Sequence, residues 1–337
     1  MTPRPAQRGR LTLLATSPRV APGLLSATAW AALRDSVVWA GTDHPQVSAL
    51  RAAGVDVRVV DEPVQASTLL DAAAGGSLVW LLSPDGDDEL VSSARTEAGA
   101  RGARAPEVDV VTGSHDLPGA RLLDLVAVMD RLRSPGGCPW DAEQTHRSLA
   151  TYLLEETYET LEAIESGDDD DLREELGDLL LQVMFHARIA EERESAAWSI
   201  DDVAAGITAK LVRRHPHVFA DAEAPTADDV KDRWEVLKRA EKQRESAVDG
   251  VPLAQPALSL AGKVLHRAAK AGLDVPVPNV DLPTEEDAAA GDAAAVGDVL
   301  LAMVAAARER GIDAEQALRD ATRRYIAAVR SAEHASK

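Results

Sequence analysis

The sequence predicts a mainly α-helical protein with a small α/β domain, built on a parallel sheet, at its N-terminal end. Up to about residue 115, short β-branched runs alternate with helical segments across turns rich in Gly, Pro and Asp, which is typical of a parallel α/β sheet. From Leu117 onward, apolar residues recur at helical spacing. A chain of 337 residues is long enough for two domains with separate cores.

In the α/β part, five short runs rich in Val and Leu are the expected strands, at residues 11–15, 37–40, 55–60, 78–82 and 108–111. The segments between them are the expected helices, at residues 23–34, 46–53, 63–74 and 88–98. Residues 1–10 are basic, but no long apolar core or cleavage site follows them. We therefore interpret them as a disordered tail and not as a signal peptide.

In the helical part, start and stop signals divide the chain. One helix is expected at residues 121–132, before a Pro-Gly break. Asp171 is expected to cap a later helix, with Glu174 in a structural role at its first turn. A helix at residues 200–213 should end at His215-Pro216, and another should follow at residues 226–244.

Carboxylates at two tight spacings mark two of these helices. Glu155, Glu156 and Glu159 share an arc of roughly 100° on the first, and Glu175 and Asp178 are neighbours on the second. If the two helices lie antiparallel across the short connector at 166–171, these carboxylates converge. Because anions at close range repel, the cluster predicts a cation, and all-oxygen ligation suits Mg²⁺ or Mn²⁺.

A solvated acidic helix face is the alternative interpretation. It fits the first helix, whose apolar positions lie opposite the glutamates: Leu153, Leu154, Tyr158, Leu161 and Ile164. The second helix, however, is apolar around most of its circumference, so we expect it to be buried. An uncompensated carboxylate in such surroundings is costly, so Glu175 and Asp178 favour the metal site.

The composition excludes several functional classes. A formal charge of −20 disfavours non-specific binding to nucleic acid or to anionic membranes, and no apolar run is long enough to span a bilayer. Cys138 is the one cysteine, which excludes an intrachain disulfide framework. The histidines at 146, 186, 215 and 217 lack zinc-ligand spacing, and no Walker loop is present. We expect a cytoplasmic protein.

Between about residues 122 and 244, several motifs follow one another: Cys138-Pro139-Trp140-Asp141, Gln144-Thr145-His146, Leu154-Glu155-Glu156-Thr157-Tyr158-Glu159, Glu174-Glu175-Leu176-Gly177-Asp178 and Arg213-Arg214-His215-Pro216-His217. In this order they resemble the MazG family of nucleoside triphosphate pyrophosphohydrolases. The resemblance implies a MazG-like helical bundle over residues 117–246 and a homodimer. It also implies Mg²⁺ dependence and cleavage of an NTP to NMP and pyrophosphate.

The same resemblance implies roles for the acidic residues. Glu156, Glu159, Glu175 and Asp178 would bind Mg²⁺, for which Mn²⁺ could substitute. Glu155 would orient or deprotonate the attacking water, or would simply face solvent.

Basic and aromatic residues would bind the substrate. Lys210, Arg213 and Arg214 match the family's basic segment and would hold phosphates, although a basic last turn also complements its own helix dipole. Trp234 and Lys238, one turn apart, would stack on a base and meet a phosphate, unless Trp234 belongs to the core.

Two flanking regions resemble altered domains. Residues 11–115 faintly resemble the first half of a tetrapyrrole-methylase domain, but the expected glycine-rich loop is replaced by residues 15–19, so we expect a non-catalytic docking or stabilising module. Residues 250–337 resemble a second MazG copy that has lost its carboxylates, with Ala295 at one such position and an acidic linker at about 275–295. Its helices, expected at 296–310 and 314–331, would support the dimer.

The sequence therefore predicts an Mg²⁺-dependent NTP pyrophosphohydrolase that removes non-standard nucleotides from the pool. The alternative is a non-enzymatic helical dimer that binds metal or nucleotide as a regulator. The two differ in turnover, since only the enzyme releases NMP and pyrophosphate.

Overall fold

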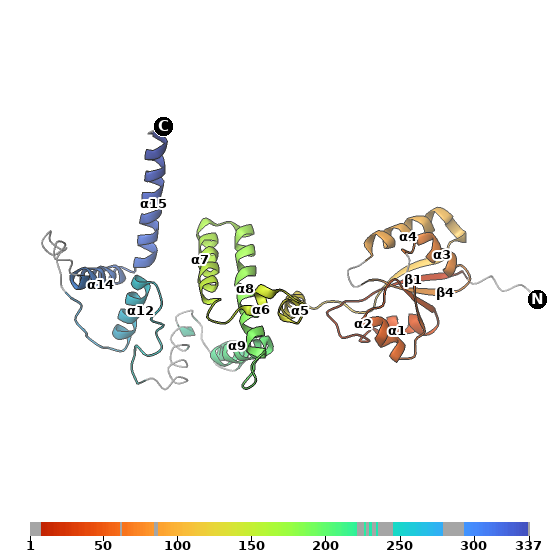
Figure 1. Cartoon of the computed structure of the whole chain (residues 1–337), viewed down its shortest axis with the longest axis horizontal. Coiled ribbons are helices and arrows are strands. Elements are labelled where there is room, and N and C mark those ends of the chain that lie inside the picture. The colour runs from red at the N-terminus through yellow and green to blue at the C-terminus, as the bar shows by residue number, and fades with distance from the viewer. Residues whose placement is uncertain are drawn as a thin grey trace, which may run out of the picture. The chain divides into compact units, whose positions relative to one another are not determined.

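The computed structural model in Figure 1 describes residues 8–60, 63–83, 87–220, 226, 229, 230, 234, 245–278 and 293–335. Its internal contacts divide the chain into two units, Met1–Gly206 and Ile207–Lys337. The first unit contains an α/β domain and a helical hairpin, and the second contains further helices. The predicted fold class, mainly helical with a small parallel sheet, is confirmed.

The α/β domain is a five-stranded sheet in the order β3-β2-β4-β1-β5, and every pairing is parallel. Its strands are β1 (Arg10–Ala15), β2 (Val37–Ala40), β3 (Val57–Val59), β4 (Ser77–Leu81) and β5 (Glu107–Thr112). Its helices are α1 (Ala27–Arg34), α2 (Pro45–Ala52), α3 (Ala66–Ala73) and α4 (Asp88–Arg101), the last followed by a 3₁₀ turn at Gly102–Arg104. β3, α1 and α3 are shorter than the sequence predicts, whereas α2 lies one residue earlier and α4 extends three residues further.

Alternation along the strands builds two cores. Leu11 and Leu13 of β1 belong to the cluster shared with α3 and α4, whereas Leu14 belongs to the cluster shared with α1 and α2. Because helices cover both faces of the sheet, the inner strands β2 and β4 are almost entirely apolar, which is the pattern of a buried parallel sheet, whereas the edge strand β5 carries Glu107 and Asp109.

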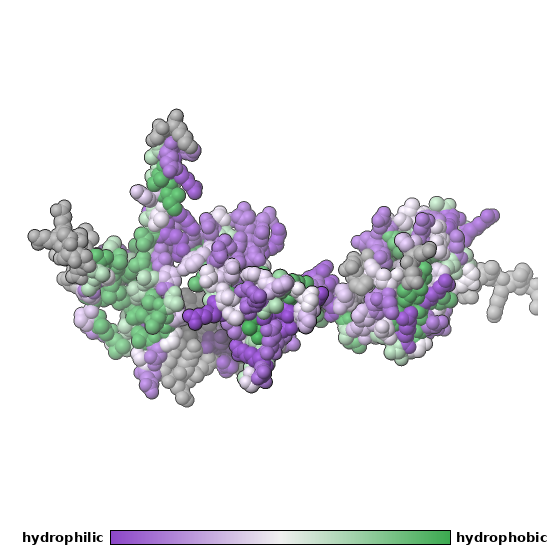
Figure 2. Space-filling model, in the orientation of Figure 1, coloured by the Kyte–Doolittle hydropathy of each residue, from purple (hydrophilic) through white to green (hydrophobic). Residues whose placement is uncertain are grey.

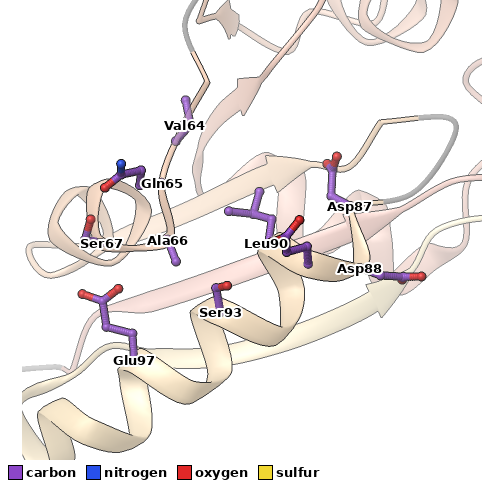
Figure 3. Close-up of a pocket in the computed structure, with 10 residues that line it drawn as sticks. Val64, Gln65, Ala66, Ser67, Asp87, Asp88, Leu90, Ser93 and Glu97 are labelled. Atoms are coloured by element: carbon purple, nitrogen blue, oxygen red, sulfur yellow. The ribbon is translucent and has the colours of Figure 1, made fainter.

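A pocket of about 630 Å³ lies where the chain follows β3 and β4, at the first turns of α3 and α4 (Figure 3). Asp87, Asp88, Glu89 and Glu97 line it, none of the described lining residues is basic, and only Glu97 is paired, with Arg101 at 2.7 Å, among the ion pairs of the described part of the chain. Such a lining disfavours an anionic ligand, because the carboxylates would repel it.

The rest of the first unit is helical and includes α5 (Arg121–Arg133), α6 (Pro139–Glu143), α7 (Ala150–Ser166) and α8 (Asp169–Glu191). α5 and α8 pack around a core of Met129, Leu149, Met184 and Phe185. α9 (Ile200–Arg214) continues from the first unit into the second and ends at His215, as predicted, before the short α10 (Pro216–Phe219).

The second unit also contains α12 (Ala257–Lys270), α14 (Ala293–Glu309) and α15 (Ala314–Ala335). Figure 2 shows hydrophobic residues gathered on the visible surface over α12 and α14. Most of the predicted acidic linker and of the N-terminal tail lies outside the described residues. None of the helices in the described part of the chain combines the length and apolar character needed to cross a membrane.

Substitutions at two neighbouring valines at the start of β2 test whether the buried one belongs to the core. Val38 is 1% exposed and Val37 is 60% exposed. We expect Val38→Ala to lower the free energy of unfolding by about 2 kcal/mol, because it removes two buried methyl groups and leaves a cavity. Val37→Ala is the matched control and should cost much less. Urea titration of the full chain, followed by tryptophan fluorescence, measures both; equal losses would contradict the assignment of Val38 to the core.

Candidate metal centre

A tight turn joins α7 to α8 and places the two helices side by side. Gly167 ends α7 with a φ of 76°, a left-handed conformation that glycine adopts without the steric cost other residues meet. Asp168 then caps α8 by accepting hydrogen bonds from the backbone N–H groups of Asp170 and Asp171 at 3.0 and 3.1 Å. The prediction that Asp171 is the cap is therefore wrong, because α8 begins earlier, at Asp169.

Thr160 ties the two helices together at the level of the acidic residues. Its hydroxyl is buried and donates to the carbonyl oxygen of Glu156 at 2.8 Å, with the carbonyl oxygen of Glu175 also within reach at 3.4 Å. The backbones that carry two of the predicted ligands are thus joined through one side chain.

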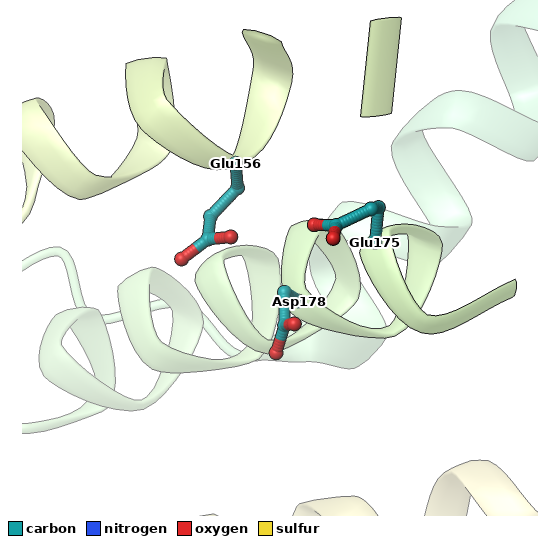
Figure 4. Close-up of side chains that lie close together, drawn as sticks. All are labelled: Glu156, Glu175 and Asp178. Atoms are coloured by element: carbon teal, nitrogen blue, oxygen red, sulfur yellow. The ribbon is translucent and has the colours of Figure 1, made fainter. Parts of the chain in front are cut away.

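Three carboxylates converge between the helices. Each of Glu156 on α7 and Glu175 and Asp178 on α8 offers an oxygen, and these oxygens all lie within 4.8 Å of one another. Figure 4 shows the three side chains pointing toward one another from facing helices. The structure thus brings together three of the four residues for which the sequence predicts metal binding.

The cluster is electrostatically strained. Partial burial, followed by the charges of Asp178 and Glu159, raises the pKa of Glu156. Burial, followed by the charges of Glu159 and Asp178, also raises the pKa of Glu175. Glu159 is exposed and lies outside the close group, yet it hydrogen-bonds to Glu156 and its charge acts on both residues.

The donor set fits a hard divalent cation. Carboxylate oxygens are the ligands that Mg²⁺ and Mn²⁺ prefer, and no basic side chain contributes to either raised pKa. A divalent cation would offset both the burial of these carboxylates and the repulsion between them, the two causes of their raised pKa values. Histidine and cysteine are absent from the close group found in the described part of the chain, which disfavours zinc.

The remaining predicted site residues are not members of this close group. Glu155 is exposed on α7. Lys210, Arg213 and Arg214 lie on α9 within the second unit. The guanidinium carbon of the buried Arg214 lies 5.8 Å from the centre of the Trp234 ring, which is a cation–π contact. Trp234 is 40% exposed and is therefore not a core residue of the single chain. Lys238 lies outside the described residues.

A histidine pair next to the hairpin was not predicted as a pair. Nδ1 of His146, just before α7, lies 2.8 Å from Nδ1 of His186 on α8, and Arg193 lies 2.9 Å from Nε2 of His146. Because a guanidinium only donates, His146 must accept at Nε2 and donate from Nδ1, so His186 accepts. Burial and then the adjacent His146 lower the pKa of His186.

Arg133 holds the segment that leads into α7. Its side chain is buried, pairs with Glu192 at 2.7 Å, and donates to the carbonyl oxygens of Asp141 and Gln144. The same guanidinium lies over the Phe185 ring at 5.5 Å. The hydrogen bond that Arg133 donates to the Glu192 carboxylate lowers the pKa of Glu192. Arg133 therefore fixes α5, α6 and the end of α8 relative to one another.

Both helices of the hairpin also carry exposed apolar side chains. Leu154, Tyr158 and Ile164 on α7, and Leu176 and Val183 on α8, are each more than 40% exposed; we call these the apolar stripes. The other apolar positions of α8 are buried or half-buried, as expected, so the expected burial of this helix fails only at Leu176 and Val183. Surfaces of this kind mark contacts with another macromolecule.

Fold and site together define a class of protein. A parallel α/β domain precedes a helical hairpin, and carboxylates from the two facing helices come together in a group suited to a divalent cation. The sequence profile of the MazG nucleotide pyrophosphohydrolase domain matches residues 144–219, which contain the hairpin.

Three relatives extend this likeness. The nucleoside triphosphate pyrophosphohydrolase of Mycobacterium tuberculosis is 44% identical over 264 residues, 78% of this chain and 71% of that protein. The Escherichia coli K12 protein of the same name is 45% identical over 219 residues, 60% of this chain and 82% of that protein. An uncharacterized 26.1 kDa protein from Streptomyces cacaoi is 48% identical over 250 residues, 74% of this chain and 98% of that protein. The chain belongs to the MazG nucleotide pyrophosphohydrolase family.

The raised pKa of Glu175 has a consequence for stability. Because the folded protein binds this proton more tightly than the unfolded chain does, cation-free stability falls as pH rises from the ordinary value of 4.5 through the raised pKa. We expect Glu175→Gln to raise the melting temperature at pH 7 in a chelator, and to have less effect near pH 4.5.

Scanning calorimetry measures this effect, with Glu155→Gln as the control, since that residue is exposed and outside the close group. An unchanged or lower melting temperature for Glu175→Gln at pH 7 would show that the carboxylates do not repel one another in solution.

Proposed function

We propose that the protein is a Mg²⁺-dependent nucleoside triphosphate pyrophosphohydrolase that converts NTP and water to NMP and pyrophosphate. The convergence of Glu156, Glu175 and Asp178 from two facing helices carries this proposal. Family membership supports it, because the relatives from M. tuberculosis and E. coli are named nucleoside triphosphate pyrophosphohydrolases. The reaction class is the hydrolysis of an acid anhydride.

The acidic residues divide the chemical work. Glu156, Glu175 and Asp178 would hold the cation, and Glu159 would complete the ligand set or add negative charge beside it. When bound, Mg²⁺ supplies charge neutralisation for the phosphates and eases deprotonation of water. Water attacks the α-phosphorus, the bond to the bridging oxygen breaks, and pyrophosphate leaves with the electron pair. Glu155, which precedes Glu156 in the sequence and is exposed, would accept the proton of that water or simply face solvent.

The substrate would be held by basic and aromatic residues. Lys210, Arg213 and Arg214 would bind phosphate oxygens, for which guanidinium groups are suited by bidentate hydrogen bonding. The contact between Arg214 and Trp234 supports this assignment, because it joins a cation to an exposed ring on which a base can stack. Lys238, one turn beyond Trp234 in the sequence, would add a further positive charge.

The flanking regions would have non-catalytic roles. The pocket of the α/β domain is acidic and does not suit phosphates, so this domain would dock or stabilise. Residues 250–337 would be an inactive second copy, because Ala295 replaces a carboxylate in the part that resembles α8. We place the reaction in the cytoplasm, where it would clear non-standard nucleotides, with neither nucleic acid nor a membrane as a partner.

The active form would be a homodimer. The apolar stripes of α7 and α8 lie on the hairpin that carries the carboxylates. Covering them with the same surface of a second copy removes these side chains from water, which favours association by roughly 25 cal/mol for each Å² of apolar surface buried.

Product analysis with a ligand variant tests the activity. The parent protein, incubated with mixed NTPs and Mg²⁺, should release NMP and pyrophosphate, separable by ion-exchange chromatography. Asp178→Ala should lose at least about 100-fold in kcat/KM while remaining folded, because a cation ligand is gone. Glu162→Gln, an exposed change on the same helix as Glu156, is the control. Release of single phosphate, or full activity of Asp178→Ala, would refute the assignment.

A charge placed in the stripe tests the dimer. Leu176→Glu should shift the protein toward monomers in sedimentation velocity runs, because a carboxylate would be buried in an apolar contact. Leu117→Glu makes the same change at another exposed leucine of the first unit and should leave the mass unchanged. A parent protein that sediments as a monomer at micromolar concentration would end this part of the proposal.

A further inference from the structure

Gln182 lies on α8 four residues after Asp178, so the two are neighbours one turn apart on the same helix face. It is 5% exposed, among the most buried polar residues that the structure describes. Its Oε1 atom is buried and accepts no hydrogen bond from any residue in the described part of the chain.

This amide is poorly suited to its immediate surroundings. Its neighbours along α8 include the buried Met184 and Phe185, which belong to the apolar core shared with Met129 and Leu149. A buried carbonyl oxygen without a donor is costly, and a methionine of similar size would fill the same space without that cost. Packing alone does not explain a glutamine at this position. A bound ligand could supply the hydrogen-bond donor that its Oε1 atom lacks.

We infer that Gln182 is a positioning residue of the metal centre, accepting a hydrogen bond from a water held by the cation; this inference rests on the proposed function. Mg²⁺ retains several waters when carboxylates bind it, and each such water needs acceptors. The carboxylate cluster is one turn away along α8, on the helix face that Gln182 shares with Asp178.

An outer position suits Gln182 better than direct ligation. The three carboxylates already converge within 4.8 Å, whereas Gln182 is not a member of that group and stands one turn nearer the apolar core. A neutral amide oxygen also accepts a hydrogen bond without adding charge to a cluster whose pKa values are already raised. Outer partners of this kind orient what the metal holds and tune its affinity.

Direct measurement of cation binding tests this role. Binding of Mn²⁺, followed in the purified full-length protein by electron paramagnetic resonance of the free ion, should be about 10-fold weaker in Gln182→Met than in the parent. The melting temperature of Gln182→Met without cation should equal or exceed that of the parent, because the unpartnered oxygen is gone.

Gln46 provides a matched control. This residue of α2 is 8% exposed and has an unpartnered Nε2 among the described residues, but it lies in the α/β domain. Gln46→Met should leave Mn²⁺ affinity unchanged.

Two results would overturn the inference. Mn²⁺ affinity of Gln182→Met within a factor of two of the parent would do so, and so would a cation-free melting temperature well below the parent, which would assign Gln182 to the fold. Failure of the metal centre itself would look different: the parent would bind Mn²⁺ no better than Asp178→Ala does, and Gln182 would lose its proposed role with it.

Discussion

The close approach of like charges between α7 and α8 is the constraint on which the rest of the hairpin depends. Three carboxylates within 4.8 Å repel one another, so something must hold the two helices together at that level. The turn at Gly167 and Asp168, the hydroxyl of Thr160 and the apolar core around Phe185 supply this restraint. Arg133 secures the far end by binding Glu192 and the segment before α7. A preformed anionic site follows, ready for a cation at little reorganisation cost.

The hairpin also reverses the usual orientation of a surface helix. In most globular proteins the apolar face of a helix turns inward and the charged face outward. α7 instead directs Glu156 toward α8 and leaves Leu154 and Tyr158 in solvent. Under the proposed function, catalysis would use the face of α7 that meets α8, and assembly would use its exposed apolar side chains. The α/β domain, by contrast, buries an apolar core on each face of its sheet.

Local sequence signals predicted most of the fold and part of the site. The runs of Val and Leu identified all five strands, because residues of a sheet that is covered on both faces are mostly apolar. The spacing of Glu156, Glu175 and Asp178 predicted their convergence, because helical periodicity and a short connector leave little freedom. The cap could not be chosen among the consecutive aspartates at 168–171, which are chemically identical. The contact between His146 and His186 joins residues 40 positions apart, and no local pattern reports such a pair. Apolar periodicity on α8 predicted its burial, but it did not reveal that Leu176 and Val183 stay exposed within the single chain.

The exposed stripes on α7 and α8 also affect how this protein is made. A newly synthesised chain exposes these apolar side chains before any partner covers them, and neighbouring new chains expose the same surface. During synthesis, association with a partner therefore competes with aggregation, and the outcome depends on protein concentration and on chaperone supply. Overproduction at high temperature would favour aggregation into inclusion bodies, even though each domain can fold.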